Sequence, residues 1–210
     1  DEFLAQTGIR LIDGIGATEM IHIFISTTAE KVRPGATGRV VPGYEARIAG
    51  EDGQTLPHGE TGRLALKGPT GCLYLNDDRQ SQYVKDGWNY TGDLYFQDED
   101  GYFWYVSRAD DLIVSSGYNI AGPEVEQALL SHESVSEAAV VGLPDKERGA
   151  VVSAFIVLKN GISGDDRLTK QIQDHVKASI APYKYPRRVE FIDALPKTQT
   201  GKIQCFKLRG

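Results

Sequence analysis

The amino-acid sequence predicts a mixed fold, in which a β-rich part is followed by a small α+β domain with a short central sheet. In residues 1–109, short apolar runs are bounded by Gly and Pro, a pattern that is typical of strands. In residues 110–210, strand-like runs alternate with two segments of helical period, which indicates an α/β or α+β unit. The sequence therefore predicts two parts that meet near residues 108–112.

The first part contains four strand candidates. Gly38–Ile48 and Gly62–Lys67 carry β-branched or alternating apolar residues with Gly and Pro at their edges. Leu94–Gln97 and Tyr102–Val106 flank the sequence Asp-Glu-Asp-Gly, in which Gly can supply the positive φ of a hairpin turn. We expect a small antiparallel sheet or barrel, and no helix longer than a few turns before Arg108.

The second part contains two helix candidates and three strand candidates. Pro123 and the acids that follow it are typical of the first turn of a helix. Leu168–Ile180 repeats apolar residues every four positions, which predicts a second helix with one apolar stripe. The runs Ala138–Val141, Val151–Leu158 and Arg187–Ile192 are expected to be strands.

The composition is that of an ordinary globular protein. Of the 210 residues, 40% are hydrophobic and 25% are charged, which excludes collagenous and disordered chains. No apolar run approaches the ~18 residues of a membrane span, so we expect no membrane partner. Cys72 and Cys205 cannot form a disulfide framework, and with no leader before Asp1 we expect a cytoplasmic protein. Cys72, among apolar neighbours, is expected to be buried.

The charge is unevenly distributed. The formal net charge of −6 argues against a nucleic-acid partner. Residues 1–109 carry 10 basic and 16 acidic side chains, whereas residues 110–210 carry 13 of each. From Ala181 onward, seven basic side chains face two acidic ones. Such an end suits a compact anion such as a nucleotide phosphate, and it also fits a solvated lysine-rich terminus.

Two segments of the first part could bind a nucleotide. Asp13–Glu19, read as a glycine-rich turn, joins a hydroxyl and a carboxylate that could contact a phosphate and its Mg²⁺. It could equally be a turn in which Thr18 and Glu19 cap a helix. Tyr90–Asp93 ends in a carboxylate that could accept ribose hydroxyls, and it could also be an Asx turn that opens the hairpin.

Two further segments lie in or next to the second part. Arg108–Ile120 combines an Arg, two acids, an apolar triplet and a Gly turn before the helix; a charged interdomain linker would look alike. Leu195–Ile203 is a polar loop in which Lys202 follows a Gly. A lysine in such a loop could stabilise negative charge in a transition state, although it could also be an ordinary surface lysine.

In this order, the segments GATE, YTGD, RADDLIVSSGYNI, PEVE and PKTQTGKI resemble the later motifs of the acyl-adenylate-forming enzymes, which include acyl-CoA synthetases, adenylation domains and luciferases. DGIGATEMIHIF is most similar to benzoate and related aryl-acid CoA ligases. The resemblance implies that residues 1–109 are the β-rich end of a large AMP-binding domain. It implies that residues 110–210 are a small mobile domain with a hinge at Asp110, and that a preceding part of the protein is missing here.

The resemblance also implies roles for individual residues. The catalytic set is Lys202, Thr18 and Glu19, with Glu19 as the Mg²⁺ ligand. The nucleotide-binding set is Asp13, Gly14, Ile15, Gly16, Thr18, Asp93, Arg108 and Lys202. The acyl-substrate set is Gly16, Ala17, His22 and Lys202, although His22 fits a structural histidine as well. The CoA-binding set is Ser116, Gly117 and Tyr118. Two positions depart from the family pattern, since Ile15 replaces a tyrosine and Cys205 stands where relatives often have Arg.

The activity implied is ATP-dependent ligation of an acid to CoA through an acyl-AMP. We expect ATP, Mg²⁺ and CoA to be used with a small aromatic acid such as benzoate, aminobenzoate or hydroxybenzoate. A medium-chain acyl-CoA synthetase, an adenylation domain that serves a carrier protein, and a non-catalytic nucleotide-binding module are the alternatives. The 210 residues alone are not expected to be active, because the phosphate loop and most of the acyl pocket are absent. A homodimer is one assembly that the resemblance allows.

Overall fold

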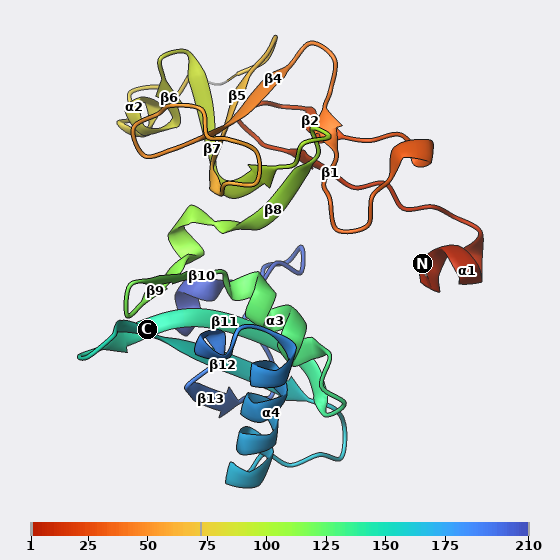
Figure 1. Ribbon diagram of the computed structural model, residues 1–210, viewed down its shortest axis with the longest axis vertical. Helices are drawn as coiled ribbons and strands as arrows, with labels where there is room; N and C mark the ends of the chain where they lie inside the picture. Colours follow the sequence, from red (N-terminus) through yellow and green to blue (C-terminus); the bar gives the residue numbers. More distant parts are fainter. Residues whose placement is uncertain (1, 72, 210) are drawn as a thin grey trace. The chain divides into compact units, whose positions relative to one another are not determined.

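The computed structural model describes residues 2–71 and 73–209 (Figure 1). The chain divides into two compact units, Asp1–Ala109 and Asp110–Gly210. The predicted mixed, sheet-rich fold is confirmed. Cys72, which was expected to be buried, lies outside the described residues. None of the helices in the described ranges has the length and apolar character that a membrane crossing requires.

The first unit is built from two sheets. The smaller is antiparallel, with the order β1 (Gly14–Gly16), β2 (Ile23–Ser26) and β3 (Arg39–Val40). The larger sheet is also antiparallel and has the order β4-β5-β7-β6, with β8 on the other edge of β7. Its strands are β4 (Glu45–Ala49), β5 (Gly62–Lys67), β6 (Val84–Lys85), β7 (Trp88–Gln97) and β8 (Phe103–Arg108). The helical pieces are short: α1 (Glu2–Thr7), η1 (Ala29–Lys31) and α2 (Arg79–Tyr83).

The core of the first unit joins its two sheets. Phe24 and Ile25 of β2 pack in one cluster with Leu64 and Leu66 of β5 and with Tyr95 of β7, and all five are buried. Runs of consecutive buried residues in β2, β5 and β7 contribute to this core, as in strands that are covered on both faces. The expected hairpin is present, because residues 98–102 join β7 to β8, with Gly101 at a φ of 82°.

One sequence-based interpretation is wrong in the first unit. Gly14–Gly16 forms strand β1 and not part of a turn. A Cβ at Gly16 would lie 2.8 Å from the backbone oxygen of His22, so this glycine permits the close approach of β1 to the chain that enters β2. The turn falls at Thr18–Met20 instead, and no helix follows it.

The second unit is a five-stranded sheet with two α-helices. The sheet has the order β10-β9-β12-β11, and β13 runs parallel to β12. Its strands are β9 (Ile113–Ser115), β10 (Tyr118–Ile120), β11 (Val135–Asp145), β12 (Gly149–Leu158) and β13 (Arg188–Phe191). The helices are α3 (Gly122–Leu130) and α4 (Asp166–Ser179), and the short 3₁₀ turns are η2 (Ala109–Asp111), η3 (Pro182–Lys184) and η4 (Cys205–Leu208).

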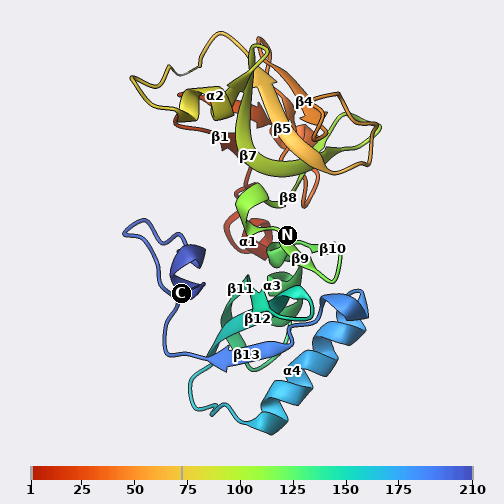
Figure 2. The same cartoon turned by 90° about the vertical axis from the view of Figure 1, so that its left-hand side faces the viewer.

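The two faces of this sheet bury different segments. Helices α3 and α4 pack through Val125 and Ile172 against Val140 and its neighbours on one face. On the opposite face, Ala139 and Val141 pack with Leu195, Cys205 and Leu208 from the end of the chain. Figure 2 shows the C-terminal segment and α4 on opposite sides of the sheet. The period-2 alternation of β11 therefore fixes where the segment that carries Lys202 can lie.

Candidate functional site

The turn after β1 presents Thr18 and Glu19. Met20 is fully buried, and its backbone N–H donates to the oxygen of Ala17 at 3.1 Å. Burial of this side chain fixes the turn and leaves Thr18 exposed and Glu19 half-buried. The turn thus holds a hydroxyl and a carboxylate side by side at the edge of the smaller sheet.

Glu19 has a partner that the motifs do not reveal. The phenol of Tyr74 donates a 2.7 Å hydrogen bond to Oε1 of Glu19. Tyr74 is itself fixed, because its backbone N–H donates to Gln80 at 2.9 Å. The contact spans 55 positions of the chain, so no local pattern could have predicted it.

The surroundings of Glu19 fit a Mg²⁺ ion that arrives with phosphate. In the described ranges, no three His, Cys, Asp or Glu side chains are grouped as a metal cluster. Mg²⁺ in nucleotide sites is usually held by one or two carboxylates, with phosphate oxygens and water as the other ligands. A single oriented carboxylate matches that donor set, whereas an all-protein cage would need more ligands.

Asp93 and Arg108 are paired. They are cross-strand neighbours in β7 and β8, and Nη1 of Arg108 donates to Oδ1 of Asp93 at 2.9 Å. Asp93 is 7% exposed, while Arg108 is exposed. A Cβ at Gly92 would lie 2.9 Å from Nη2 of Arg108, so Gly92 leaves the room that this guanidinium needs. A carboxylate and a guanidinium held together can accept from and donate to a pair of vicinal hydroxyls.

The remaining predicted residues of the first unit are Asp13, Ile15, Ala17 and His22, and none of them is fully buried. Asp13 lies near the phenol of Tyr95: burial raises the pKa of this phenol, and the negative charges of Asp93 and Asp13 raise it further. Ile15 and Ala17 are half-buried against the core cluster. His22 is exposed, and its Nδ1 lies 2.7 Å from the backbone oxygen of Ile23.

In the second unit, Ser116 and Gly117 form the tip of the β9–β10 hairpin. Their φ angles are 51° and 81°, as a two-residue type I′ turn requires. Arg148 supports the tip, because its backbone oxygen accepts from the N–H of Ser116 at 2.9 Å and its Nη1 donates to Oγ at 3.1 Å. Tyr118 stacks on Tyr183 with ring centroids 4.5 Å apart. The exposed Gly117 is therefore held by a rigid base.

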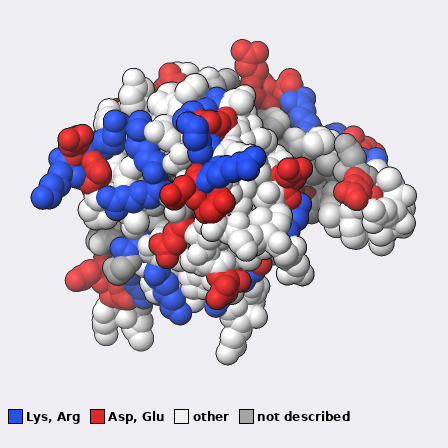
Figure 3. Space-filling model, turned by 90° about the horizontal axis from the view of Figure 1, so that it is seen from below, with Lys and Arg blue, Asp and Glu red and all other residues white. Residues whose placement is uncertain are grey.

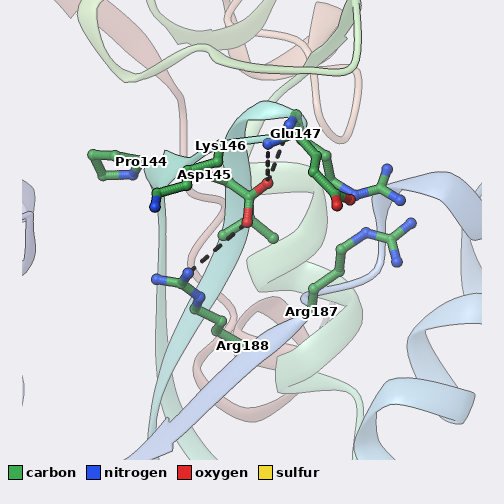
Figure 4. Close-up of a pocket in the computed structure, with 8 residues that line it drawn as sticks. Pro144, Asp145, Lys146, Glu147, Arg187 and Arg188 are labelled. Atoms are coloured by element: carbon green, nitrogen blue, oxygen red, sulfur yellow. Dashed lines mark hydrogen bonds and ion pairs between the residues drawn. The ribbon is translucent and has the colours of Figure 1, made fainter.

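A basic pocket of about 580 Å³ (Figure 4) shares Arg148 with this hairpin, because Arg148 lines the pocket and also donates to Ser116. Lys146, Arg148, Arg187 and Arg188 line it, against only two carboxylates. One of these, Asp145, accepts from the N–H groups of Glu147 and Arg148 at 3.1 Å and lies 3.9 Å from Arg188. The lining therefore has an excess of positive charge, which favours an anionic ligand. Figure 3 shows Lys and Arg side chains interspersed with Asp and Glu on the face that it presents.

Lys202 lies on a second hairpin. Lys197 and Ile203 form a β-bridge, and the N–H of Thr198 donates to the oxygen of Lys202 at 2.8 Å. Gly201, at a φ of 84°, closes the turn. The Lys202 side chain is exposed, and in the described part of the chain its ammonium has no hydrogen bond or ion pair. It is free to meet a ligand.

The structure thus brings Asp93 to Arg108 and places Thr18 next to Glu19, while Lys202 and the Gly117 turn lie on separate loops of the second unit. The supporting residues Tyr74, Arg148 and Tyr183 are not predicted by the sequence motifs. Each of them contacts a residue that is distant in the sequence, namely Glu19, Ser116 and Tyr118 respectively. The sequence offered one signal, the clustering of Arg and Lys at residues 146–148 and 187–188.

The chain belongs to the AMP-binding enzyme family. The family model for AMP-binding enzymes matches residues 1–73, and the family model for the C-terminal domain of AMP-binding enzymes matches residues 124–202. Together they cover well over half of the chain. The predicted membership of the adenylate-forming enzymes is confirmed.

The relatives include acid–CoA ligases and acyl-coenzyme A synthetases. The chain is 45% identical over 208 residues to a benzoate–CoA ligase from Thauera aromatica, covering 98% of this chain and 40% of that protein. It is 44% identical over 218 residues to the mitochondrial acyl-coenzyme A synthetase ACSM3 of Mus musculus, covering 100% and 38%. A crystal structure of the anthranilate CoA ligase AuaEII with anthranoyl-AMP matches with a TM-score of 0.89 at 44% identity, covering 99% and 40%. The chain thus spans about 40% of the length of these relatives.

Proposed function

We propose that the complete protein is an AMP-forming acid–CoA ligase that acts on benzoate-type acids. The observation that carries the proposal is Lys202, which is exposed on its glycine-closed hairpin and has no partner among the described residues, in the same unit as the Gly117 turn. These loops offer two separate surfaces for two successive reactions. The names of a benzoate–CoA ligase and of an anthranilate CoA ligase among the relatives support the choice of acid.

In the first reaction, a carboxylate oxygen of the acid attacks the α-phosphorus of ATP, and pyrophosphate leaves with the electrons of the broken P–O bond. Two anions must approach each other, so catalysis requires positive charge at the reacting oxygens. The ammonium of Lys202 would supply this charge, and Thr18 would donate to an α-phosphate oxygen. Mg²⁺, held by Glu19, would neutralise part of the phosphate charge.

The nucleoside would be held by the first unit. The carboxylate of Asp93 would accept from the ribose hydroxyls, and Arg108 would donate to them while it orients Asp93. Asp13, Gly14, Ile15 and Gly16 would border the adenine, with Gly16, Ala17 and His22 next to the acyl group. With Ile15 at the position of the family's tyrosine, adenine would be contacted by an aliphatic side chain and not by a ring.

In the second reaction, the sulfur of CoA attacks the acyl carbon, its proton is lost to solvent, and AMP leaves. The exposed turn formed by Ser116, Gly117 and Tyr118 would guide the pantetheine. The basic pocket beside it would receive the phosphates of CoA, because Arg148 lines the pocket and also holds Ser116. Charge-assisted hydrogen bonds from guanidinium groups are suited to such phosphates.

A medium-chain acid, the alternative expected from the sequence, is a second candidate substrate. The identity to a mitochondrial acyl-coenzyme A synthetase, 44%, is almost the same as that to the benzoate–CoA ligase, so it does not favour the aromatic acid. An assay of AMP release by the complete protein decides between them, with ATP, CoA and, in turn, benzoate, aminobenzoate, hydroxybenzoate and octanoate. We expect the highest kcat/KM with one of the aromatic acids. Highest activity with octanoate would favour the second candidate, and no AMP release with any acid would favour a non-catalytic nucleotide-binding module.

A further inference from the structure

The hairpin that carries Lys202 has little support of its own. Residues 197–203 are all exposed. The hydrogen bonds across the hairpin are few, and they include the N–H of Thr198 to the oxygen of Lys202 and the N–H of Gln204 to the oxygen of Pro196, each at 2.8 Å. A two-stranded hairpin of this kind is at best marginally stable in water. A contact outside the hairpin is therefore needed to hold the lysine in one position.

Apolar side chains fix the base of the hairpin but not its direction. Leu195, 5% exposed, packs with Ala139 and Val141 of β11, and Cys205 packs in the same cluster. Burial raises the pKa of the Cys205 thiol, and the charges of Asp111 and Glu126 raise it further. Apolar contacts are not directional, so they leave the orientation of the hairpin relative to the sheet free to change.

Two ion pairs on either side of the hairpin remove that freedom. Before the turn, Nζ of Lys197 lies 2.5 Å from Oε2 of Glu137 in β11. After the turn, Nη2 of Arg209 pairs with Oδ1 of Asp111. Asp111 directly follows the proposed hinge residue Asp110, so the second pair ties the end of the Lys202 segment to the beginning of the second unit.

The negative charges near Asp111 explain why a cation, Arg209, is favoured at this position. Glu126 of α3 is close enough to Asp111 for their charges to repel, and this repulsion, together with burial as the larger cause, raises the pKa of Glu126. Oε1 of Glu126 accepts the N–H of Val140 at 2.8 Å, which keeps this carboxylate in place. The guanidinium of Arg209 thus offsets a local excess of negative charge.

From this geometry we propose that Arg209 and Lys197 are positioning residues for Lys202, which clamp its hairpin to Asp111 beside the hinge and to Glu137 in the sheet. The inference rests on the proposed function of Lys202 in acyl-AMP formation. Half-exposed ion pairs contribute little to global stability. Local opening of a hairpin needs far less free energy than global unfolding, so the same pairs can decide how often Lys202 is in place.

The test uses Arg209→Ala, Arg209→Lys and Lys197→Ala in the complete protein. We expect both alanine variants to slow acid-dependent pyrophosphate exchange by about 10- to 100-fold, the loss that a misplaced catalytic group causes. The reaction of supplied acyl-AMP with CoA should keep the wild-type rate, and Arg209→Lys should recover part of the exchange. Asp174→Asn, which removes the exposed ion pair to Lys177 in α4, is the matched control and should leave both rates unchanged.

Hydrogen exchange at the amides of Thr198 and Gln204 gives a readout that does not depend on activity. We expect exchange at both amides to be faster in the alanine variants and unchanged in Asp174→Asn. Unaltered amide exchange in the alanine variants, or equal loss of both half-reactions, would overturn the clamp. If the wild-type protein forms no acyl-AMP with any acid, the proposed function fails, and amide exchange alone then decides whether the clamp holds the hairpin.

Discussion

At the scale of single residues, the ammonium of Lys202 is the group on which the proposed first half-reaction would depend. We expect Lys202→Ala to reduce pyrophosphate exchange in the complete protein by about 10²- to 10³-fold, the effect of removing one charge-stabilising donor. The reaction of supplied acyl-AMP with CoA should be almost unaffected, because in our proposal the Gly117 turn, and not Lys202, guides the CoA in that step. The measurement is the rate of each half-reaction by itself, compared between Lys202→Ala and the wild-type protein.

Lys207 provides the matched control for this variant. It is an exposed lysine in η4, just beyond the same hairpin, and Lys207→Ala should retain both rates. A Lys202→Ala protein that loses both half-reactions equally would contradict the proposed role, since such a loss is the effect of general disruption.

Gly117 is the corresponding residue for the proposed second half-reaction. We expect Gly117→Leu to block transfer to CoA and to spare pyrophosphate exchange, because an exposed Leu at the tip would occupy the path of the pantetheine. In the described part of the chain, no atom outside the turn lies within 4 Å of a Cβ at this position, so the substitution causes no clash there. The φ of 81° is nevertheless unfavourable for any L-residue.

A strain control separates these two effects. Gly117→Ala carries the same unfavourable φ without the bulk, and Gly161→Leu introduces the same side chain at another open glycine with a φ of 83°. Both should retain far more CoA transfer than Gly117→Leu. Normal CoA transfer in Gly117→Leu would refute the assignment of this turn to pantetheine.

Residues within short motifs could be predicted from the sequence, whereas their long-range partners could not. The neighbours Thr18 and Glu19 are adjacent in the chain, so one turn suffices to place both. Tyr74 reaches Glu19 only because the smaller sheet and the segment before α2 meet in space. Such a contact is a property of tertiary packing, and no local preference encodes it.

At the scale of secondary-structure elements, His132 and His175 link the end of α3 to α4. Their rings meet edge to face at 5.2 Å, and Ser131 lies 2.8 Å from Nε2 of His175. Burial lowers the pKa of His132, and repulsion by His175 and Lys159 adds to this effect against the opposing charge of Glu133. Protonation of His132 is therefore less favourable in the folded state than in the unfolded state.

The sign of the pH dependence follows from that lowered pKa. As the pH falls below the ordinary value of 6.5, the unfolded state takes up a proton before the folded state does, so the stability contributed by neutral His132 is lost on acidification. NMR titration of the ring should give a pKa for His132 below 6.5, and His175→Gln should raise it. A pKa at or above 6.5 in the wild-type protein would contradict the packing of this helix pair.

The bounds of elements with a clear periodicity of apolar residues were predicted to within a few residues, whereas those of very short strands were not. The four-residue apolar spacing located α4, which begins two residues earlier because Asp165 caps it by accepting the N–H of Leu168 at 2.7 Å. Strand β5 coincides with its prediction. The hairpin β9–β10 has only three residues on each side, too few to show a period, and it depends on the positive φ of Ser116 and Gly117.

At the scale of the whole molecule, the second unit carries two proposed surfaces that must act in turn. The base of the Lys202 hairpin packs on one face of its sheet, and the Gly117 turn lies at the tip of the β9–β10 hairpin at the sheet edge. The reacting acyl-AMP, however, would stay bound to the residues of the first unit. A rotation between the two half-reactions is the simplest way for both surfaces to reach one acyl group.

Asp110 is the position at which this rotation can be tested, because the two compact units meet there in the chain. We expect Asp110→Pro in the complete protein to slow one half-reaction much more than the other. Proline fixes its own φ near −65° and restricts the residue before it, so it should favour one of the two orientations. Asp110→Ala, which removes the charge and leaves the backbone free, should retain both half-reactions. Equal rates of both half-reactions in Asp110→Pro, relative to those of Asp110→Ala, would show that the backbone at this residue does not have to move, and the hinge would then lie elsewhere.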